Sequence, residues 1–204
     1  MEIEEIKILK SVLSKEIGWL WPIFLIKCLF RKRPVFNKSR WSKSEGAESE
    51  FVERFSFASA VYLELQKKLG KEKALEIMKN IMVPVGYNEQ WKHFQSLEVF
   101  GKKPMEQFME FNNLMDRKGA PQFNKRRYIR QDDNVCHFVI TRCIFNDFFV
   151  EVGTPELTKM FCEVDREFFP KAFPDLNFHR GSSWENTIAY GMKYCEFIFE
   201  KKRI

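Results

Sequence analysis

A change of hydrophobic period at residues 125–143 decides the fold, and that stretch reads KRRYIRQDDNVCHFVITRC. Two runs of strand-forming residues flank Asp132-Asp-Asn134, a composition typical of a hairpin turn. In the second run Phe138 and Ile140 share one face of a strand, because side chains alternate between the faces. The stretch therefore predicts two antiparallel strands joined by a tight turn.

The residues after this hairpin predict two helices and two further strands. Residues 146–152 form a short helix that Gly153 ends, and Pro155 stands at the first position of the next helix. Strands are expected at 176–180 and 194–200. The order β-β-α-α-β-β predicts an α+β fold, with an antiparallel sheet covered by helices.

The first 120 residues have the apolar spacing of helices. Steps of three and four predict helices at 2–17, 48–69, 71–82, 88–100 and 104–117. Gly70 is expected to end the second of these helices, and Pro84 to follow the end of the third. We expect an N-terminal helical extension at 1–47 and a main domain at 48–204, made of helices to residue 120 and an α+β part from 121.

The stretch Trp19–Phe30 is apolar apart from Lys27 and leads into Arg31-Lys-Arg33. It is shorter than the roughly 20 residues that cross a bilayer. The stretch predicts either a helix buried against the core or an interfacial helix, whose tryptophans and basic flank face lipid headgroups. Peripheral membrane contact through Trp19–Phe30 is thus one interaction that the sequence suggests.

Composition indicates a globular protein in a reducing compartment. The 204 residues carry a formal charge of +6, and the five cysteines are an odd number. The N-terminus lacks a secretion signal, so we expect free thiols and a cytoplasmic location, with peripheral membrane contact as the variant. The basic clusters match no nucleic-acid signature, which favours a small anionic ligand over nucleic acid. The sequence carries no signal for a particular oligomeric state.

Several enzyme classes are disfavoured because their motifs are absent. The chain contains no GxGxxG, Walker loop, HExxH or GxSxG motif. This argues against Rossmann dehydrogenases, P-loop NTPases, zincins and α/β-hydrolases.

Cys162 and Asp165 stand one turn apart on a predicted helix and therefore share a face. A thiol nucleophile with a neighbouring carboxylate for proton transfer needs this arrangement. A buried cysteine above a surface carboxylate has the same spacing. Reactivity of Cys162 toward an alkylating agent at neutral pH distinguishes the two interpretations, since an activated nucleophile is a thiolate.

Three thiols come from three elements of the α+β part, Cys143, Cys162 and Cys195. They could line one pocket, although a single cysteine is most often a small core residue. We predict no cofactor. A metal bound by these cysteines, with Asp165 or His179 as fourth ligand, is an alternative that lacks the paired spacing of zinc sites.

His179 and Arg180 follow one another at the end of a predicted strand. His179 is the candidate for a titratable catalytic partner. Arg180 and Arg142 suit a substrate carboxylate, because a guanidinium binds a carboxylate through two parallel hydrogen bonds. A surface salt bridge is the alternative for either arginine.

The α+β part resembles the L-2-amino-thiazoline-4-carboxylate hydrolase family over roughly residues 50–200. The resemblance is carried by Phe138-Val-Ile-Thr-Arg-Cys143, Gly153-Thr-Pro-Glu-Leu157, Cys162-Glu-Val-Asp165, Phe178-His-Arg180 and Gly191-Met-Lys-Tyr-Cys-Glu-Phe197, with an upstream echo at Leu69-Gly-Lys-Glu-Lys-Ala74. Where the family often has Cys-Asp in the last motif, this chain has Cys195-Glu196, and the segment before residue 50 is outside the match.

The resemblance implies a hydrolase that opens a small cyclic isothiourea carboxylate. It implies Cys162 as nucleophile, Asp165 in proton transfer and Arg180 on the substrate carboxylate, and His179 stays the further catalytic candidate from its own position. Arg142, Cys143, Cys195 and Glu196 would complete the substrate site. A non-catalytic ligand-binding module, or a cysteine-based metal or redox module on the same fold, is the alternative.

Overall fold

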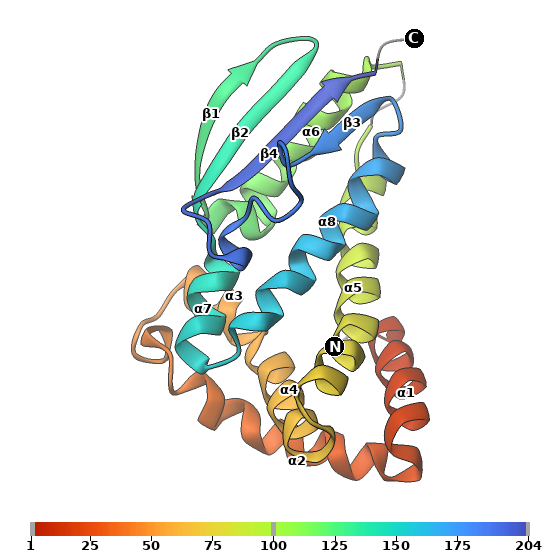
Figure 1. Cartoon of the computed structure of the whole chain (residues 1–204), viewed down its shortest axis with the longest axis vertical. Helices are drawn as coiled ribbons and strands as arrows, with labels where there is room; N and C mark the ends of the chain where they lie inside the picture. The colour runs from red at the N-terminus through yellow and green to blue at the C-terminus, as the bar shows by residue number, and fades with distance from the viewer. Residues whose placement is uncertain (1–2, 99–100, 203–204) are drawn as a thin grey trace. The chain divides into compact units, whose positions relative to one another are not determined.

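The computed structural model describes residues 3–98 and 101–202, and Figure 1 shows a four-stranded sheet with helices beside it. The strands are β1 Lys125–Gln131, β2 Val135–Arg142, β3 Leu176–His179 and β4 Cys195–Lys201. Their order is β1-β2-β4-β3, and all three pairings are antiparallel. The predicted α+β class and the order β-β-α-α-β-β are confirmed.

The α-helices of the described ranges mostly match the predicted ones. They are α1 Ile3–Ile17, α2 Trp21–Phe36, α3 Ala47–Glu53, α4 Ser56–Leu69, α5 Lys71–Gln95, α6 Pro104–Lys118, α7 Ile144–Val152 and α8 Thr158–Ala172. Gly70 ends α4 with a φ of 84°, a backbone conformation that residues with a Cβ seldom adopt. The last two residues of the predicted helix 88–100 lie outside the described residues.

Two helix predictions were wrong in detail. The single helix predicted at 48–69 is two helices, since α3 ends at Glu53 and α4 begins at Ser56. The stop expected at Pro84 does not occur, because α5 continues through it to Gln95. Buried residues such as Ile81 before the proline, and core-packed ones such as Trp91 after it, stabilise helix on both sides. Packing outweighs the local cost of proline here.

The chain divides into two compact units. The first is Met1–Gly86 with Phe145–Phe161, and the second is Tyr87–Ile144 with Cys162–Ile204. Both units are discontinuous in sequence. The division expected at residue 47 stays a prediction.

In the first unit, α2 packs on α4 and buries one side only. Cys28, Val35 and Phe36 of α2 are buried, whereas Trp19 and Phe30 are largely exposed. Glu64 of α4 is buried and forms ion pairs with Lys27 and Arg31 of α2. No helix in the described ranges has the length and apolar character needed to cross a membrane.

In the second unit, phenylalanines fill the space between the sheet and its helices. The core cluster includes Phe108 and Phe111 from α6, Phe168, Phe169 and Phe173 at α8, and Phe138, Phe197 and Phe199 from the sheet. Phe108 stacks on Phe199 with ring centroids 3.9 Å apart. One face of β4, which begins at Cys195, is therefore fixed against the helices. The packing fixes the start of β4, which is the part of the sheet where the candidate site lies.

Candidate active site

Cys162, Asp165, Arg180 and Cys195 meet in the second unit. Arg180 Nη2 donates to Asp165 Oδ2 at 2.8 Å. The Cys162 thiol donates to Thr187 Oγ1 at 3.8 Å. Charge interactions couple Cys162 to Asp165, Arg180 and Cys195. The helix α8, the residue after β3 and the start of β4 thus supply one cluster.

Arg180 is the most unusual member of the cluster. Its side chain is 1% exposed, yet Nε and Nη1 have no hydrogen-bond partner among the described residues. The guanidinium carbon lies 4.2 Å from the centre of the Phe197 ring and 4.8 Å from that of Trp184. A buried donor without a partner costs about 1–3 kcal/mol, and more when it is charged. Nε and Nη1 of Arg180 are therefore available to a further hydrogen-bond acceptor.

The segment from Gly181 to Gly191 forms one wall of the cluster and is held by hydrogen bonds. Asn186 Nδ2 donates to the Arg180 carbonyl at 2.8 Å, and Glu196 N donates to the Asn186 carbonyl at 3.0 Å. The Ile188 amide donates to Cys195 Sγ at 3.2 Å. These bonds place Thr187 and Trp184 of the segment against Cys162 and Arg180.

Gly181 is required where this segment leaves Arg180. Its φ is 69°, and a Cβ added there would lie 2.5 Å from Glu196 Oε2. A side chain at this position would be strained and would displace the Glu196 carboxylate. The glycine therefore allows the chain to turn tightly after the arginine.

Burial sets the protonation of the two candidate catalytic groups. Burial raises the pKa of Asp165 to about 6, although the Arg180 charge and hydrogen bonds from Gln90 and Arg180 oppose the rise. Burial raises the pKa of the Cys162 thiol to about 12, with Arg180 opposing. At neutral pH Cys162 is thus a thiol in the unliganded protein, and Asp165 is a carboxylate close to its titration range.

Cys195 is buried beside the same cluster. Burial raises the pKa of its thiol, and the Ile188 hydrogen bond and the Arg180 charge oppose the rise. Cys195 belongs to the buried core cluster, on the same face of β4 as Phe197 and Phe199. Cys195 is therefore an uncharged thiol next to Cys162.

His179 and Glu196 are not part of this cluster. His179 follows Phe178, whose ring packs on the core, and its Nε2 lies 3.4 Å from Glu200 Oε2. Glu196 Oε1 lies 3.1 Å from His137 Nε2. Because side chains alternate along a strand, both residues belong to the sheet face opposite the core. Roles for His179 and Glu196 in catalysis or binding stay predictions.

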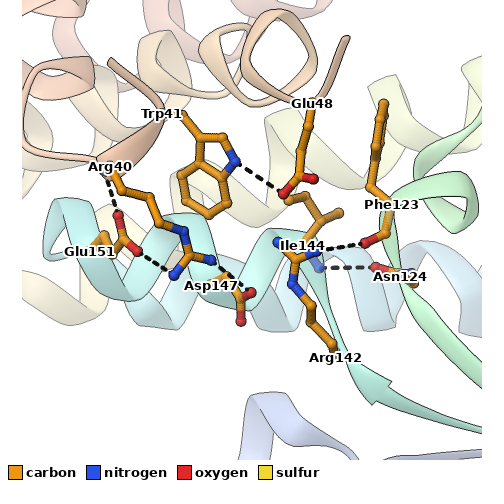
Figure 2. A network of polar contacts seen from close by, with 9 residues as sticks. All are labelled: Arg40, Trp41, Glu48, Phe123, Asn124, Arg142, Ile144, Asp147 and Glu151. Atoms are coloured by element: carbon orange, nitrogen blue, oxygen red, sulfur yellow. Dashed lines mark hydrogen bonds and ion pairs between the residues drawn. The ribbon is translucent and has the colours of Figure 1, made fainter. Parts of the chain in front are cut away.

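Arg142 is the last residue of β2 and Cys143 follows it, at the end of the strand where Ile140 pairs with Cys195 of β4. Arg142 Nη1 donates to the Phe123 carbonyl at 3.3 Å, and beside it the Ile144 amide donates to Asn124 Oδ1 at 2.9 Å (Figure 2). Cys143 is half-buried and packs against the core cluster. The substrate-binding roles predicted for Arg142 and Cys143 also stay predictions.

The thiols are not arranged as a metal centre. Within residues 3–98 and 101–202, no group of three or more His, Cys, Asp or Glu side chains is placed to hold a metal ion. Cys136 and Cys28 are buried elsewhere as free thiols. The alternative ligand set of Cys143, Cys162 and Cys195 is therefore not assembled in the part of the chain described.

Three residues of the cluster carried no sequence signal. Gln90 comes from α5 and hydrogen-bonds Asp165, while Thr187 and Trp184 come from the segment after Arg180. None belongs to a recognised motif or to a run with a clear period. Only the hydrophilic, turn-rich composition of residues 181–187 marked that segment as a loop.

A surface hollow of about 420 Å³ lies elsewhere on the second unit, and six residues line it: Arg130, Asn134, Val135, Glu200, Lys201 and Lys202. None of the clustered residues lines it. Cys162 itself is 7% exposed and Asp165 keeps 19% of its side chain exposed. Solvent therefore reaches the cluster more readily at Asp165 than at the thiol.

Family comparison places the cluster in a known context. A model of the family described as L-2-amino-thiazoline-4-carboxylic acid hydrolase matches residues 50–199. The chain belongs to this family. The match includes every residue of the cluster and runs from α3 into β4, and it leaves out α1 and α2.

Other comparisons add little to this membership. No curated protein matches the chain. Among solved structures, the Fe(II) unliganded H-NOX protein from K. algicida aligns with a TM-score of 0.35 and 11% identity, covering 100% of this chain and 98% of the other. A single-residue mutant of that protein gives 0.37 and 10%, over 100% and 97%. Scores this low support no inference about this chain.

Proposed function

We propose that this member of the hydrolase family opens a small cyclic isothiourea carboxylate of the 2-amino-thiazoline-4-carboxylate type. The observation that carries the proposal is Arg180, buried with Nε and Nη1 unpaired while Nη2 is held by Asp165. The unpaired Nε–H and Nη1–H groups point in different directions, because Nη1 lies on the Cδ side of the guanidinium. Each of them can donate a charge-assisted hydrogen bond to a carboxylate oxygen. A substrate carboxylate bound there would bring its ring toward Cys162 and Asp165.

The ring opening needs a nucleophile and a proton carrier. Cys162 passes its proton to the Asp165 carboxylate as Sγ adds to the amidine carbon. The ring C–S bond then breaks, and the leaving sulfur takes that proton from Asp165. Water adds to the same carbon, the bond to Sγ breaks, and the N-carbamoyl thiol product leaves. One proton of the water ends on Cys162, and the other is released to solvent, because the ring nitrogen of the protonated amidine already carries its proton.

The raised pKa of Cys162 makes this route dependent on the substrate. A thiol with a pKa of about 12 gives up its proton to Asp165 only when a positive charge comes close. The protonated amidine of the substrate supplies that charge, next to the sulfur that attacks it. The unliganded protein would therefore be unreactive toward general alkylating agents and become reactive with substrate bound.

The experiment measures thiol release from 2-amino-thiazoline-4-carboxylate by purified protein. Cys162→Ser and Asp165→Asn are each expected to lower kcat by at least about 100-fold. Cys136→Ser is the matched control, because Cys136 is as deeply buried, has a pKa raised to about 11 and lies outside the cluster. Full activity in Cys162→Ser would remove the thiol from the mechanism, and no turnover by the wild type would remove this substrate.

A second candidate, a non-catalytic carboxylate-binding module, is favoured by the protonated state of Cys162. In that case Arg180 binds the ligand and Cys162 only packs beside it. Binding of the thiazoline carboxylate without thiol release, unchanged by Cys162→Ser, would support this candidate.

A further inference from the structure

Helix α2 is apolar on both sides, but the fold covers only one of them. Its inner side carries Cys28, Val35 and Phe36, which are buried. A helix that is apolar all round is normally enclosed by protein or lipid. The uncovered side of α2 therefore calls for an explanation.

The outer face of α2, extended by one residue of the 3-10 turn Gly18–Leu20 before it, consists of large exposed side chains: Trp19, Ile23, Ile26, Leu29 and Phe30. Steps of three and four residues place them on one side of the helix. Trp19 is 82% exposed and Phe30 is 79% exposed. We call this set the outer face. Single exposed apolar residues are ordinary, but a continuous row of five is typical of an interaction surface.

The charge around the outer face has one sign. Residues 17–43 contain seven Lys or Arg residues and no Asp or Glu. Two of the seven, Lys27 and Arg31, share a single carboxylate, Glu64 of α4, which also lies 3.6 Å from Lys67. One buried carboxylate among three cations leaves a net positive charge beside the outer face.

We propose that the outer face of α2 docks on an anionic lipid surface, with the helix lying in the plane of the membrane. Its 16 residues span ~24 Å, less than the ~30 Å hydrocarbon core, so it suits lying on the surface. Trp19 fits this position, because tryptophan side chains are enriched at the headgroup level of membranes. Arg33 and Lys38 follow on the same segment and meet the anionic headgroups.

Charge complementarity selects lipid over a second copy of the chain. Lys32 already pairs with Glu53 of its own chain, and Arg40 pairs with two carboxylates of α7. Residues 17–43 of another copy would still bring an excess of cations and no acidic side chain of their own to pair with them. An anionic membrane offers a hydrocarbon interior for the aromatic residues of the outer face. Its negatively charged headgroups pair with the Lys and Arg side chains beside that face. The proposal is independent of the ring-opening activity, since the family match begins at residue 50.

The test is sedimentation of the full chain with vesicles of phosphatidylcholine, with and without phosphatidylglycerol. The wild type should sediment with the mixed vesicles, and Trp19→Ser/Phe30→Ser should reduce its partition at least about tenfold. Val150→Ser/Met192→Ser, which removes two other exposed apolar side chains, should leave partition unchanged. Arg33→Gln and Lys38→Gln should each reduce it about fivefold.

Three results would overturn the proposal. One is equal partition of the wild type onto phosphatidylcholine alone, and another is equal loss in the outer-face variant and its control. The third is concentration-dependent dimerisation without lipid that Trp19→Ser/Phe30→Ser abolishes, which would assign the face to a second copy. Circular dichroism and thermal unfolding of each variant separate lost docking from lost folding.

Discussion

Arg40 in the first unit and Arg180 in the second both bind carboxylates, but in opposite surroundings. Arg40 is 57% exposed, and Figure 2 shows its guanidinium between Asp147 and Glu151. Its Nη2 lies 3.1 Å from Asp147 and its Nη1 3.0 Å from Glu151. Arg180 is fully buried and has one bonded nitrogen and two without a partner among the described residues.

The difference separates a structural arginine from one set up for a ligand. Arg40 also lies over the Trp41 ring, whose indole nitrogen donates to Glu48 at 3.0 Å. Its bonds join the segment after α2 to α7, and they are complete without any ligand. Unpaired buried donors are rare in folded proteins, so those of Arg180 support the ligand role proposed for it.

Arg180→Met should give the largest effect. Loss of two charge-assisted hydrogen bonds to the substrate carboxylate is expected to lower kcat/KM by about 1,000-fold, or roughly 4 kcal/mol. The free energy of unfolding should change much less, because the variant also removes two unpaired buried donors. Steady-state kinetics and urea unfolding on the same samples check both parts. A large loss of stability with unchanged kcat/KM would make Arg180 a structural residue.

The pH dependence of stability should reveal Asp165. Its folded pKa of about 6 lies above the ordinary value of 3.8, so folding favours its protonated form. The resulting stability is complete below pH ~4 and is lost as the pH rises through about 6, a change of about 2–3 kcal/mol. Asp165→Asn should lack this loss. Urea unfolding between pH 4 and 7 checks it, and parallel curves for the two proteins would contradict it.

Trp184→Phe should have a moderate effect confined to ligand binding. Trp184 Nε1 is buried without a partner among the described residues, and its ring lies over Arg180. If the substrate accepts from this nitrogen, its loss weakens binding about tenfold, while stability stays within about 1 kcal/mol. Titration calorimetry measures the affinity. Unchanged affinity would leave Trp184 only the role of covering the guanidinium.

Arg40→Met should give the smallest effect. Exposed ion pairs contribute up to about 1 kcal/mol each, so the free energy of unfolding should fall by about 1 kcal/mol. The kinetic constants for ring opening should stay unchanged. Thermal unfolding in low and high salt checks the electrostatic origin, because salt screens exposed pairs. A loss of activity similar to that of Arg180→Met would end the distinction between the two arginines.

The sequence predicted the parts of the site that follow from local periodicity. Cys162 and Asp165 share a helix face because they are three residues apart, and Arg180 follows a strand with a clear pattern. The same periodicity puts His179 on the face opposite Phe178. The alternation of side chains along the strand therefore argues against a catalytic pair of His179 and Cys162.

Other features depend on contacts between distant residues and could not be predicted. Gln90 reaches Asp165 from α5, 75 positions earlier, and no pattern marks it. The continuation of α5 through Pro84 depends on packing along both halves of the helix. The raised pKa of Cys162 also comes from burial, which a spacing argument does not supply.

The most direct test of the account is a calorimetric comparison of two ligands. The Cys162→Ala protein, which cannot turn over, is titrated with 2-amino-thiazoline-4-carboxylate and with its uncharged carboxamide. The account predicts that the carboxylate binds about 100-fold more tightly, and that adding Arg180→Met removes this preference. Equal binding of the two ligands, or a preference that survives Arg180→Met, would contradict it.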